Sequence, residues 1–297
     1  SKRGRFRASG QCPRSNSDGL RTSISGPLCS RSSSTVTERA IPMPDIVGQR
    51  RASQGRLQSM LSGSSPATSL SPDQLLERFA TGNPRQRRSL IKTVEARIGD
   101  LEALGDGLLE PFDPAGDDWA AGWILQLLHR QHPERVSALL GSCPDGWFKV
   151  ESAVGIDYRG LQQDLLQEDF QAADRFTSAA LRQLAGPEAE RRGYVYFSEV
   201  PAMPGVDLTV IDRLWTAYSQ GRFGFTTQAR LLQALGGRYN LLWPRIGWKL
   251  DGVWTRYPGA FTWSLEAPEG HMPLVNQLRG VRLMDALLNH PALQQRR

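Results

Sequence analysis

Between residues 71 and 150, apolar residues recur at intervals of three and four, which is the spacing of amphipathic helices. The pattern predicts five short helices, over residues 72–80, 84–98, 101–109, 119–130 and 133–140. Glycine, asparagine and proline separate these segments, and a proline opens three of them. Their apolar faces are sufficient for a small helical bundle.

A second helical region follows a linker at residues 141–155, where Trp147 and Phe148 are expected to pack across the boundary. Periodicity predicts helices near residues 161–166, 170–184, 207–221, 226–235 and 274–289, and a short extended piece at 194–197. In the last helix, the residues expected to face inward are Leu278, Val281, Met284, Leu287 and Leu288.

The helix predicted near residues 207–221 is the centre of this region, because its apolar stripe includes two aromatic side chains that need a core to face. We expect Asp207 to cap its N-terminus and Gly221 to end it in a left-handed conformation. Thr226 or Thr227 is expected to cap the helix that follows.

Aromatic residues concentrate in two places. Phe223 and Phe225 occupy the elbow after the central helix, where such side chains usually pack in the core. Six more lie in sequence of little regular period: Trp243, Trp248, Trp254, Tyr257, Phe261 and Trp263. Aromatic side chains in irregular backbone either fix a loop to the core or line an apolar ligand cleft, and composition leaves both possibilities open.

These patterns predict an all-α fold with a small helical bundle at residues 71–150 and a helical domain with long aromatic loops at residues 151–297. Residues 1–70 hold 16 serines, 11 basic and 3 acidic residues and hardly any apolar period, so we expect a disordered basic arm. Its composition is also typical of an organellar transit peptide. A third interpretation is translation from upstream of the natural start, since Met43 and Met60 both lie inside the arm. Only Phe6 could stack on a base, so no nucleic-acid partner is expected.

Several classes of function have no support in the residues. No apolar run is long enough to form a membrane-spanning helix. Cys12, Cys29 and Cys143 lack the spacing of a disulfide or thiolate site, and His129 and His132 have no matching ligands, so no metal site is expected. The phosphate-binding and dinucleotide-binding glycine motifs, the HExxH motif and an activated nucleophile are all missing, which makes an enzyme the weaker hypothesis.

The residues that do indicate a ligand are the aromatic loops together with Arg279 and Arg282, three apart on one predicted helix. Guanidinium groups match carboxylates and aromatic rings cover planar faces, so a flat amphipathic carboxylic acid would use both. The alternative is that the two arginines pair with acids such as Asp285 or Glu266 and only brace the structure.

The string LWTAYSQGRFGFTTQ, at residues 214–228, resembles the genomes-uncoupled-four family of tetrapyrrole-binding regulators of magnesium chelatase. The resemblance covers about residues 151–293. Further matching motifs occur in order at Gly155–Tyr158, Ile246–Trp248, Phe261–Trp263, Gly270–Gly280 and His290–Pro291.

The resemblance implies an all-helical domain whose loops form a cupped apolar site for protoporphyrin IX and Mg-protoporphyrin IX. Arg279 and Arg282 match positions implicated in porphyrin binding, and Trp263 is the counterpart of a mobile-loop tryptophan, with Trp254 as the alternative. Met203 stands where the family usually has Phe before Pro. The expected porphyrin-binding set is therefore Arg279, Arg282, Trp263, Trp254, Phe223, Phe225, Met203 and Arg192.

The same resemblance implies a regulator without catalytic residues, which binds porphyrins and stimulates the chelatase through its large porphyrin-binding subunit. The helical segment before residue 151 is similar in placement to that of cyanobacterial members, so we expect a cyanobacterial cytoplasm, with possible peripheral association with the thylakoid membrane. A plastid stroma is the alternative location. The rival function is a helical interaction scaffold that has no small-molecule ligand and contacts partners through residues 71–150.

Overall fold

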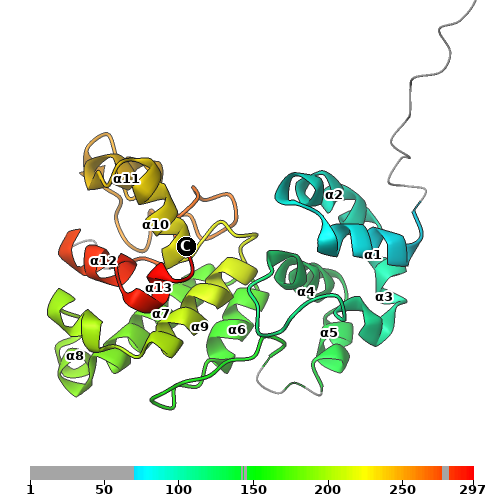
Figure 1. Ribbon diagram of the computed structural model, residues 1–297, viewed down its shortest axis with the longest axis horizontal. Coiled ribbons are helices and arrows are strands. Elements are labelled where there is room, and N and C mark those ends of the chain that lie inside the picture. The colour runs from blue at the N-terminus through cyan, green and yellow to red at the C-terminus, as the bar shows by residue number, and fades with distance from the viewer. Residues whose placement is uncertain (1–69, 142, 144–145, 276–280) are drawn as a thin grey trace, which may run out of the picture. The chain divides into compact units, whose positions relative to one another are not determined.

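The computed structural model describes residues 70–141, 143, 146–275 and 281–297 (Figure 1). The predicted arm, except for its last residue, and Leu278 and Arg279 of the predicted last helix lie outside the described residues. Across the part that is described, helices dominate and the strands form one two-stranded hairpin, which confirms the all-α class.

The first helices are α1 (Pro72–Thr81), α2 (Pro84–Ala96), α3 (Ile98–Glu102), the 3-10 turn η2 (Gly105–Leu108), α4 (Trp119–Gln131) and α5 (Pro133–Leu139). Among them, α1, α2, α4 and α5 begin where the sequence predicts. At the start of α1, Ser71 and Gln74 cap each other's backbone N–H groups, with the Gln74 N–H donating to Ser71 Oγ at 3.2 Å. The predicted single helix at 101–109 is wrong: Gly105 takes a left-handed φ of 58°, which interrupts it.

Helix α4 is buried along almost its whole circumference, from Ala120 to Leu128. It packs against α6 and α9 of the later region, and one side chain joins all three helices. The Gln126 amide nitrogen donates to the backbone oxygens of Leu165 and Tyr218, at 2.8 and 2.7 Å. Because α4 has no polar face to turn to water, it is the helix around which residues 71–150 pack.

The remaining elements carry the second region. They are α6 (Arg159–Leu166), α7 (Phe170–Ala185), α8 (Pro187–Arg192), the 3-10 turn η3 (Phe197–Ala202), α9 (Gly205–Ala217), α10 (Phe225–Ala234), α11 (Tyr239–Arg245), β1 (Lys249–Leu250), β2 (Val253–Trp254), α12 (Val281–Leu288) and α13 (Pro291–Gln294). Helix α6 packs on α7, α13 on α9, and α12 on both η3 and α10 (Figure 1). The piece predicted to be extended at 194–197 instead leads into η3.

The central helix α9 starts earlier than predicted, at Gly205, so Asp207 is not its cap. Asp207 lies inside the first turn, and its buried carboxylate accepts hydrogen bonds from the Tyr158 hydroxyl at 2.8 Å and the Ala153 N–H at 3.0 Å. The Asp207 carboxylate therefore binds groups from distant parts of the chain instead of capping the helix as local rules predict. At the other end, Gly221 has the expected left-handed φ of 71°, but it does not end the helix, because α9 already ends at Ala217.

Helix α10 is capped from another helix rather than by its own threonines, which corrects the prediction for Thr226 and Thr227. The helix begins at Phe225, and Asp212 of α9 accepts hydrogen bonds from the Thr226 N–H and hydroxyl, at 2.9 and 2.8 Å. Phe223 and Phe225 are fully buried, which confirms that the elbow belongs to the core.

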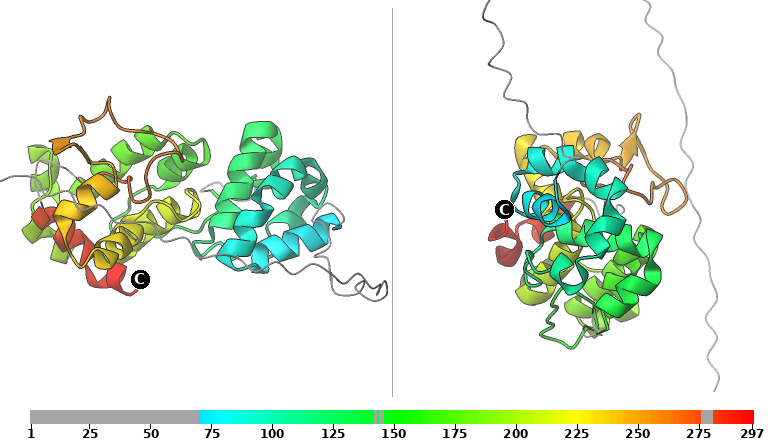
Figure 2. Two further views of the ribbon diagram at one scale, coloured as in Figure 1. Left: turned by 90° about the horizontal axis from the view of Figure 1, so that it is seen from above. Right: turned by 90° about the vertical axis from the view of Figure 1, so that its right-hand side faces the viewer.

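The long aromatic segment contains structure that the periodicity does not predict. Helix α11 forms despite Pro244, and the two-stranded hairpin follows, with Lys249 opposite Trp254. The hairpin projects from the helices in both views of Figure 2, and its residues Leu250 and Val253 are 74% and 71% exposed. These aromatics divide between the two roles left open: Trp243 and Trp248 stack in the core at 5.6 Å, whereas Trp254 lines a cavity.

The last long helix is shorter in its described part than predicted, and α12 begins at Val281. Met284, Leu287 and Leu288 are buried as expected. Val281 is 41% exposed, so its predicted inward orientation is wrong. The inward face of α12 is completed by Leu283, which is buried.

The described residues belong to one compact unit, and their buried apolar side chains form a continuous cluster. Phe148, from the predicted linker, is buried and its ring meets that of Tyr218 at 5.3 Å, which confirms the packing expected of this segment. We predict that residues 151–297 fold without the rest of the chain. In the described ranges, no helix is long and apolar enough to cross a membrane.

Candidate functional site

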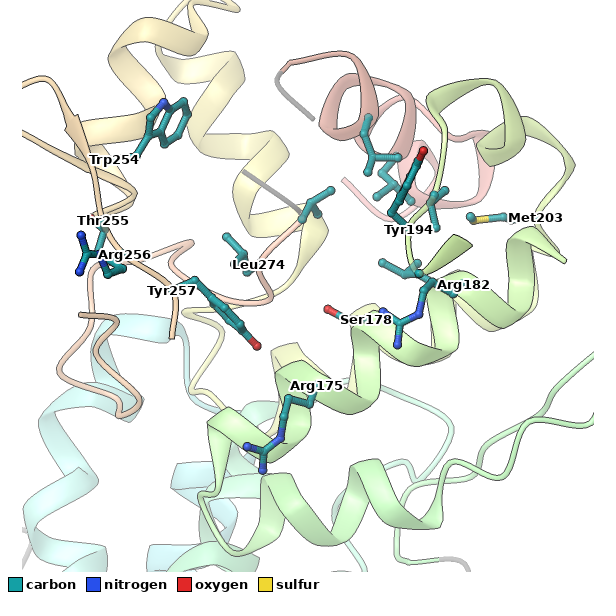
Figure 3. Close-up of a pocket in the computed structure, with 16 residues that line it drawn as sticks. Arg175, Ser178, Arg182, Tyr194, Met203, Trp254, Thr255, Arg256, Tyr257 and Leu274 are labelled. Carbon is teal, nitrogen blue, oxygen red and sulfur yellow. The ribbon is translucent and has the colours of Figure 1, made fainter. Parts of the chain in front are cut away.

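A cavity of about 740 Å³ opens between α7, α12 and three connecting segments (Figure 3). Its lining residues are Arg175, Ser178, Leu181, Arg182, Gly193, Tyr194, Val195, Met203, Trp254, Thr255, Arg256, Tyr257, Leu274, Val275, Leu283 and Leu287. This volume lies within the range of pockets that hold drug-sized ligands and cofactors, roughly 300–1,000 Å³. The cavity is therefore large enough for a sizeable small molecule.

Apolar side chains from distant parts of the chain form much of the wall. Leu181 projects from α7, Leu283 and Leu287 from α12, and Leu274 and Val275 from the segment before it. All five are buried. Since they come from elements that the core already holds in place, the apolar surface is formed before any ligand arrives.

The polar part of the lining is cationic. Arg175 and Arg182 lie seven residues apart on α7, a spacing that puts them on one face of the helix, and Arg256 follows the hairpin. Among the residues described, no aspartate or glutamate lines the cavity, and none of these three arginines forms an ion pair. Their charges are available to an anionic ligand.

Two of the predicted porphyrin-binding residues lie in this cavity, Met203 after η3 and Trp254 on β2. Trp263 does not line it: the Trp263 ring stacks on Phe261 at 5.6 Å, and its N–H donates to the Pro258 oxygen at 3.1 Å. Phe223 and Phe225 are core residues with no exposed surface and lie outside the lining.

The predicted arginines lie elsewhere or are engaged. Arg192 donates to both carboxylate oxygens of Glu199, at 2.8 and 2.7 Å, and stacks over the Tyr194 ring at 4.8 Å, so it supports a lining residue. Arg282 is an exposed residue of α12 whose guanidinium lies 5.4 Å from the centre of the Phe197 ring. Arg279 lies outside the described residues.

Sequence reasoning missed Arg175, Arg182 and Arg256 as lining residues, and it named Tyr257 only among the aromatic side chains that could line a cleft or fix a loop. For α7 a signal was present, because Arg175 and Arg182 are seven residues apart and lie on one helical face with Ser178 between them. For Tyr257 the signal was the density of aromatic residues, which does not distinguish a cleft from a loop packed on the core. Figure 3 shows its side chain directed from the loop toward α7.

One buried carboxyl group links three walls of the cavity. Asp174 of α7 has no exposed surface, and its Oδ1 accepts a hydrogen bond from the Leu274 N–H at 2.6 Å. The Tyr257 hydroxyl lies near the same carboxyl group. Among the described residues, Asp174 Oδ2 has no hydrogen-bond partner of ordinary length. Burial raises the pKa of Asp174 to about 7, and the Leu274 N–H, Tyr257 and Arg175 offset part of the shift.

The free energy of unfolding should therefore decrease as the pH rises above 3.8, because the unfolded state then loses the Asp174 proton while the folded state still keeps it. The pKa of this group is 3.8 without the folded environment and about 7 within it, so the folded state binds the proton more tightly between those values. The stabilisation is complete below pH 3.8 and is lost as the pH rises through about 7. Asp174→Asn keeps an acceptor for Leu274 but cannot ionise, so it should gain stability over the unmodified protein at up to ~1.4 kcal/mol per pH unit.

Urea denaturation of both proteins across this pH range measures the difference. Asp100→Asn is a matched control, because the Asp100 side chain is 55% exposed on α3. A stability difference between Asp174→Asn and the unmodified protein that does not change with pH would contradict the assignment.

His271 has a structural role in the core. Its Nδ1 lies 2.7 Å from the Ile246 oxygen, its own backbone oxygen accepts from the Trp248 indole at 2.8 Å, and its ring meets Phe261 at 4.7 Å. Burial lowers its pKa. No group of three potential metal ligands occurs among His, Cys, Asp and Glu in the described part of the chain.

Comparison with known proteins gives a consistent result. A family model described as GUN4-like matches residues 151–291. The Ycf53-like protein of Synechocystis sp. is 47% identical over 177 residues, which cover 59% of this chain and 76% of that protein. The tetrapyrrole-binding protein, chloroplastic, of Arabidopsis thaliana is 38% identical over 141 residues, which cover 44% of this chain and 53% of that protein.

The similarity extends beyond the matched domain. The ycf53 protein of Pyropia yezoensis is 39% identical over 228 residues, which cover 74% of this chain and 95% of that protein. Residues 151–297 make up only half of the chain, so this match reaches into the helices before residue 151. Both the motif-bearing region and the preceding helical region therefore have relatives, and the chain belongs to the GUN4-like family.

Proposed function

We propose that this protein binds a tetrapyrrole in the cavity between α7 and α12 and acts as a regulator rather than as an enzyme. The observation that carries the proposal is an apolar cavity of about 740 Å³ with three arginines and no acidic side chain in its described lining. The name of the Arabidopsis relative, a tetrapyrrole-binding protein, supports the ligand class.

The chemistry of the ligand fits the two kinds of lining. A porphyrin is a flat apolar ring that carries ionised propionate groups on one edge. The leucines of α7 and α12 and the indole of Trp254 would cover the ring, where burial contributes roughly 25 cal/mol per Å² of apolar surface. Arg175 and Arg182 would meet the propionates, because a guanidinium fork matches a carboxylate.

Arg279 and Arg282 remain proposed as further propionate partners. Arg282 is exposed on α12, the helix that contributes Leu283 and Leu287 to the cavity. It has no ion pair among the described residues, so its charge is not already used by an acid such as Asp285. The family resemblance supports this pair, and the cavity lining supports Arg175 and Arg182.

The specific ligands proposed are protoporphyrin IX and Mg-protoporphyrin IX, and the specific partner is the large porphyrin-binding subunit of magnesium chelatase. The protein would deliver or hold porphyrin for that subunit, in the cytoplasm of a cyanobacterium or the stroma of a plastid, with peripheral association at the membrane surface. Chelatase rates measured with and without the protein test this step. A rate that does not respond would remove the partner from the proposal.

Binding is tested by titrating the full chain with protoporphyrin and its dimethyl ester while following tryptophan fluorescence and the Soret band. Arg175→Gln and Arg182→Gln should each weaken binding of the acid by roughly 5- to 20-fold, since charge-assisted hydrogen bonds contribute ~1.5–3 kcal/mol and solvent exposure reduces this. The ester cannot ionise, so it should bind the unmodified protein more weakly and respond little to either substitution. Arg191→Gln, at a 74% exposed side chain outside the cavity, is the control.

The same measurement on Arg279→Gln and Arg282→Gln decides between the two arginine pairs. The pair whose substitution weakens the acid but spares the ester holds the propionates. Equal losses for acid and ester would indicate that an arginine only braces the structure. No saturable change with any porphyrin would overturn the binding proposal and leave an interaction scaffold.

A further inference from the structure

A second cavity, of about 710 Å³, shares no lining residue with the first. It lies between α2, the start of α4, the turn that joins α9 to α10, and the residues after α13. Six arginines line it: Arg87, Arg88, Arg222, Arg230, Arg296 and Arg297. Only three acidic residues share the described lining, so the second cavity has a positive excess of three charges.

Three of the six arginines are already paired. Arg87 donates to Asp118 at 2.9 Å, Arg230 to Glu269 at 2.8 Å, and Arg296 to Asp117 at 2.7 Å. These pairs account for every acidic residue in the described lining. They also hold the walls of the second cavity in place, since each joins segments that are far apart in the chain.

The other three have no carboxylate partner within the described residues. The Nε of Arg88 donates to the Pro84 oxygen at 3.1 Å, and its two terminal nitrogens have no hydrogen-bond partner among the residues described. Arg222 donates from Nη2 to the Ala267 oxygen at 2.7 Å, and its buried Nε has no partner in the same part of the chain. Arg297 likewise forms no ion pair here. A concave surface concentrates the field of such charges, so an anion should be drawn into it.

The neutral lining adds hydrogen-bonding groups. Thr216 and Thr227 contribute hydroxyl groups, and Gln220 and Gln233 contribute amides. The volume is that of a small-molecule pocket rather than of a flat protein interface. A ligand that satisfies guanidinium groups and hydroxyl groups together is one with several anionic oxygens.

We propose that the second cavity binds a small polyanion bearing phosphate or carboxylate groups, held by Arg88 and Arg222. The site is independent of the proposed tetrapyrrole cavity. Because its walls come from α2 and α4 on one side and from α9 and α10 on the other, the bound anion would fasten these helices to one another.

Calorimetric titration of the full chain with tripolyphosphate or with citrate, in parallel with melting curves, tests the proposal and separates the two anion classes. We expect saturable binding of at least one of them and a rise in melting temperature. Arg88→Gln and Arg222→Gln should each lower the affinity by about tenfold, the effect of losing one charge-assisted contact. Arg85→Gln is the matched control, because it removes the same charge from an exposed position of α2 outside the second cavity.

Three results would overturn the proposal. The first is the absence of saturable binding by either anion at low ionic strength. The second is an equal loss in Arg85→Gln and Arg88→Gln, which would indicate attraction by net charge alone. The third is full binding by the Arg88→Gln, Arg222→Gln double variant with an unchanged melting temperature in the absence of ligand, which would place the anion on the 11 basic residues of the N-terminal arm.

Discussion

Replacing Gly122 with alanine is expected to separate α4 from α9 and to destabilise the protein by ~3 kcal/mol or more. A Cβ at this position would lie 2.7 Å from the backbone carbon of Ala217 and 3.2 Å from the backbone nitrogen of Tyr218. Both atoms belong to the end of α9, which is held on its other faces by buried side chains. Overpacking against an element that cannot yield typically costs 1–3 kcal/mol, and more where backbone is struck.

Urea denaturation measures the loss, and Gly99→Ala is the matched control. Gly99 is a helical glycine of α3 with no atom within 4 Å of the added carbon, so alanine there should be neutral or slightly stabilising. If Gly122→Ala had the same free energy of unfolding as the unmodified protein, this result would contradict the close packing of α4 on α9. A variant that unfolds in two steps would support the predicted independence of residues 151–297.

The second large effect is expected at Asp212, where substitution by alanine should cost ~3–5 kcal/mol. Its carboxylate has no exposed surface and accepts from the Thr226 N–H at 2.9 Å, the Thr226 hydroxyl at 2.8 Å and Arg296 Nε at 3.0 Å. Removing it leaves a helix N-terminus uncapped and a largely buried guanidinium short of one partner.

Thermal and urea denaturation of Asp212→Ala, Asp212→Asn and Glu188→Ala separate these contributions. Asparagine retains one acceptor for Thr226 but no charge for Arg296, so its loss should be intermediate. Glu188 forms an exposed pair with Arg191, so its removal should cost at most ~1 kcal/mol. Similar losses at Asp212 and Glu188 would contradict the role of Asp212 as a shared cap.

Helix starts with local caps could be predicted, and those with remote caps could not. Ser71 and Gln74 are three residues apart, so their reciprocal bonds are visible as a sequence pattern. The cap of α10 comes from Asp212, 14 residues before its partner, and only the folded elbow brings them together. The same limit applies to Asp207, whose partner hydroxyl on Tyr158 is 49 residues away.

Helix α11 was not predicted, because the apolar residues of its segment have little regular period. Pro244 lies near the end of the helix, where Trp243 is buried and stacks on Trp248 with an angle of 6° between the rings. Burial of two indoles outweighs the single backbone bond that proline removes. Helix propensity describes a local stretch of sequence, whereas this packing depends on Trp248, which lies outside the helix.

The site was partly predictable for a similar reason. Aromatic density identified the loop that supplies Trp254, and the family motif identified the segment around Met203. The cavity arginines of α7 were missed because the period that predicts this helix comes from its apolar face, which contains Phe170, Ala173 and Leu181. The cavity is lined where the apolar face of α7 meets the face that carries Arg175 and Arg182. Which residues of α7 lie at this border depends on the elements that pack against the helix.

The amide of Gln126 ties α4 to carbonyl groups that lie 39 and 92 residues farther along the chain. During synthesis, α4 therefore leaves the ribosome well before the helices that cover it. At ~5–20 residues per second, the wait for the end of α9 lasts about 5 to 18 s. During that time the apolar surface of α4 is exposed, because the helices that bury it have not yet been synthesised. We therefore expect chaperones to bind this segment during translation.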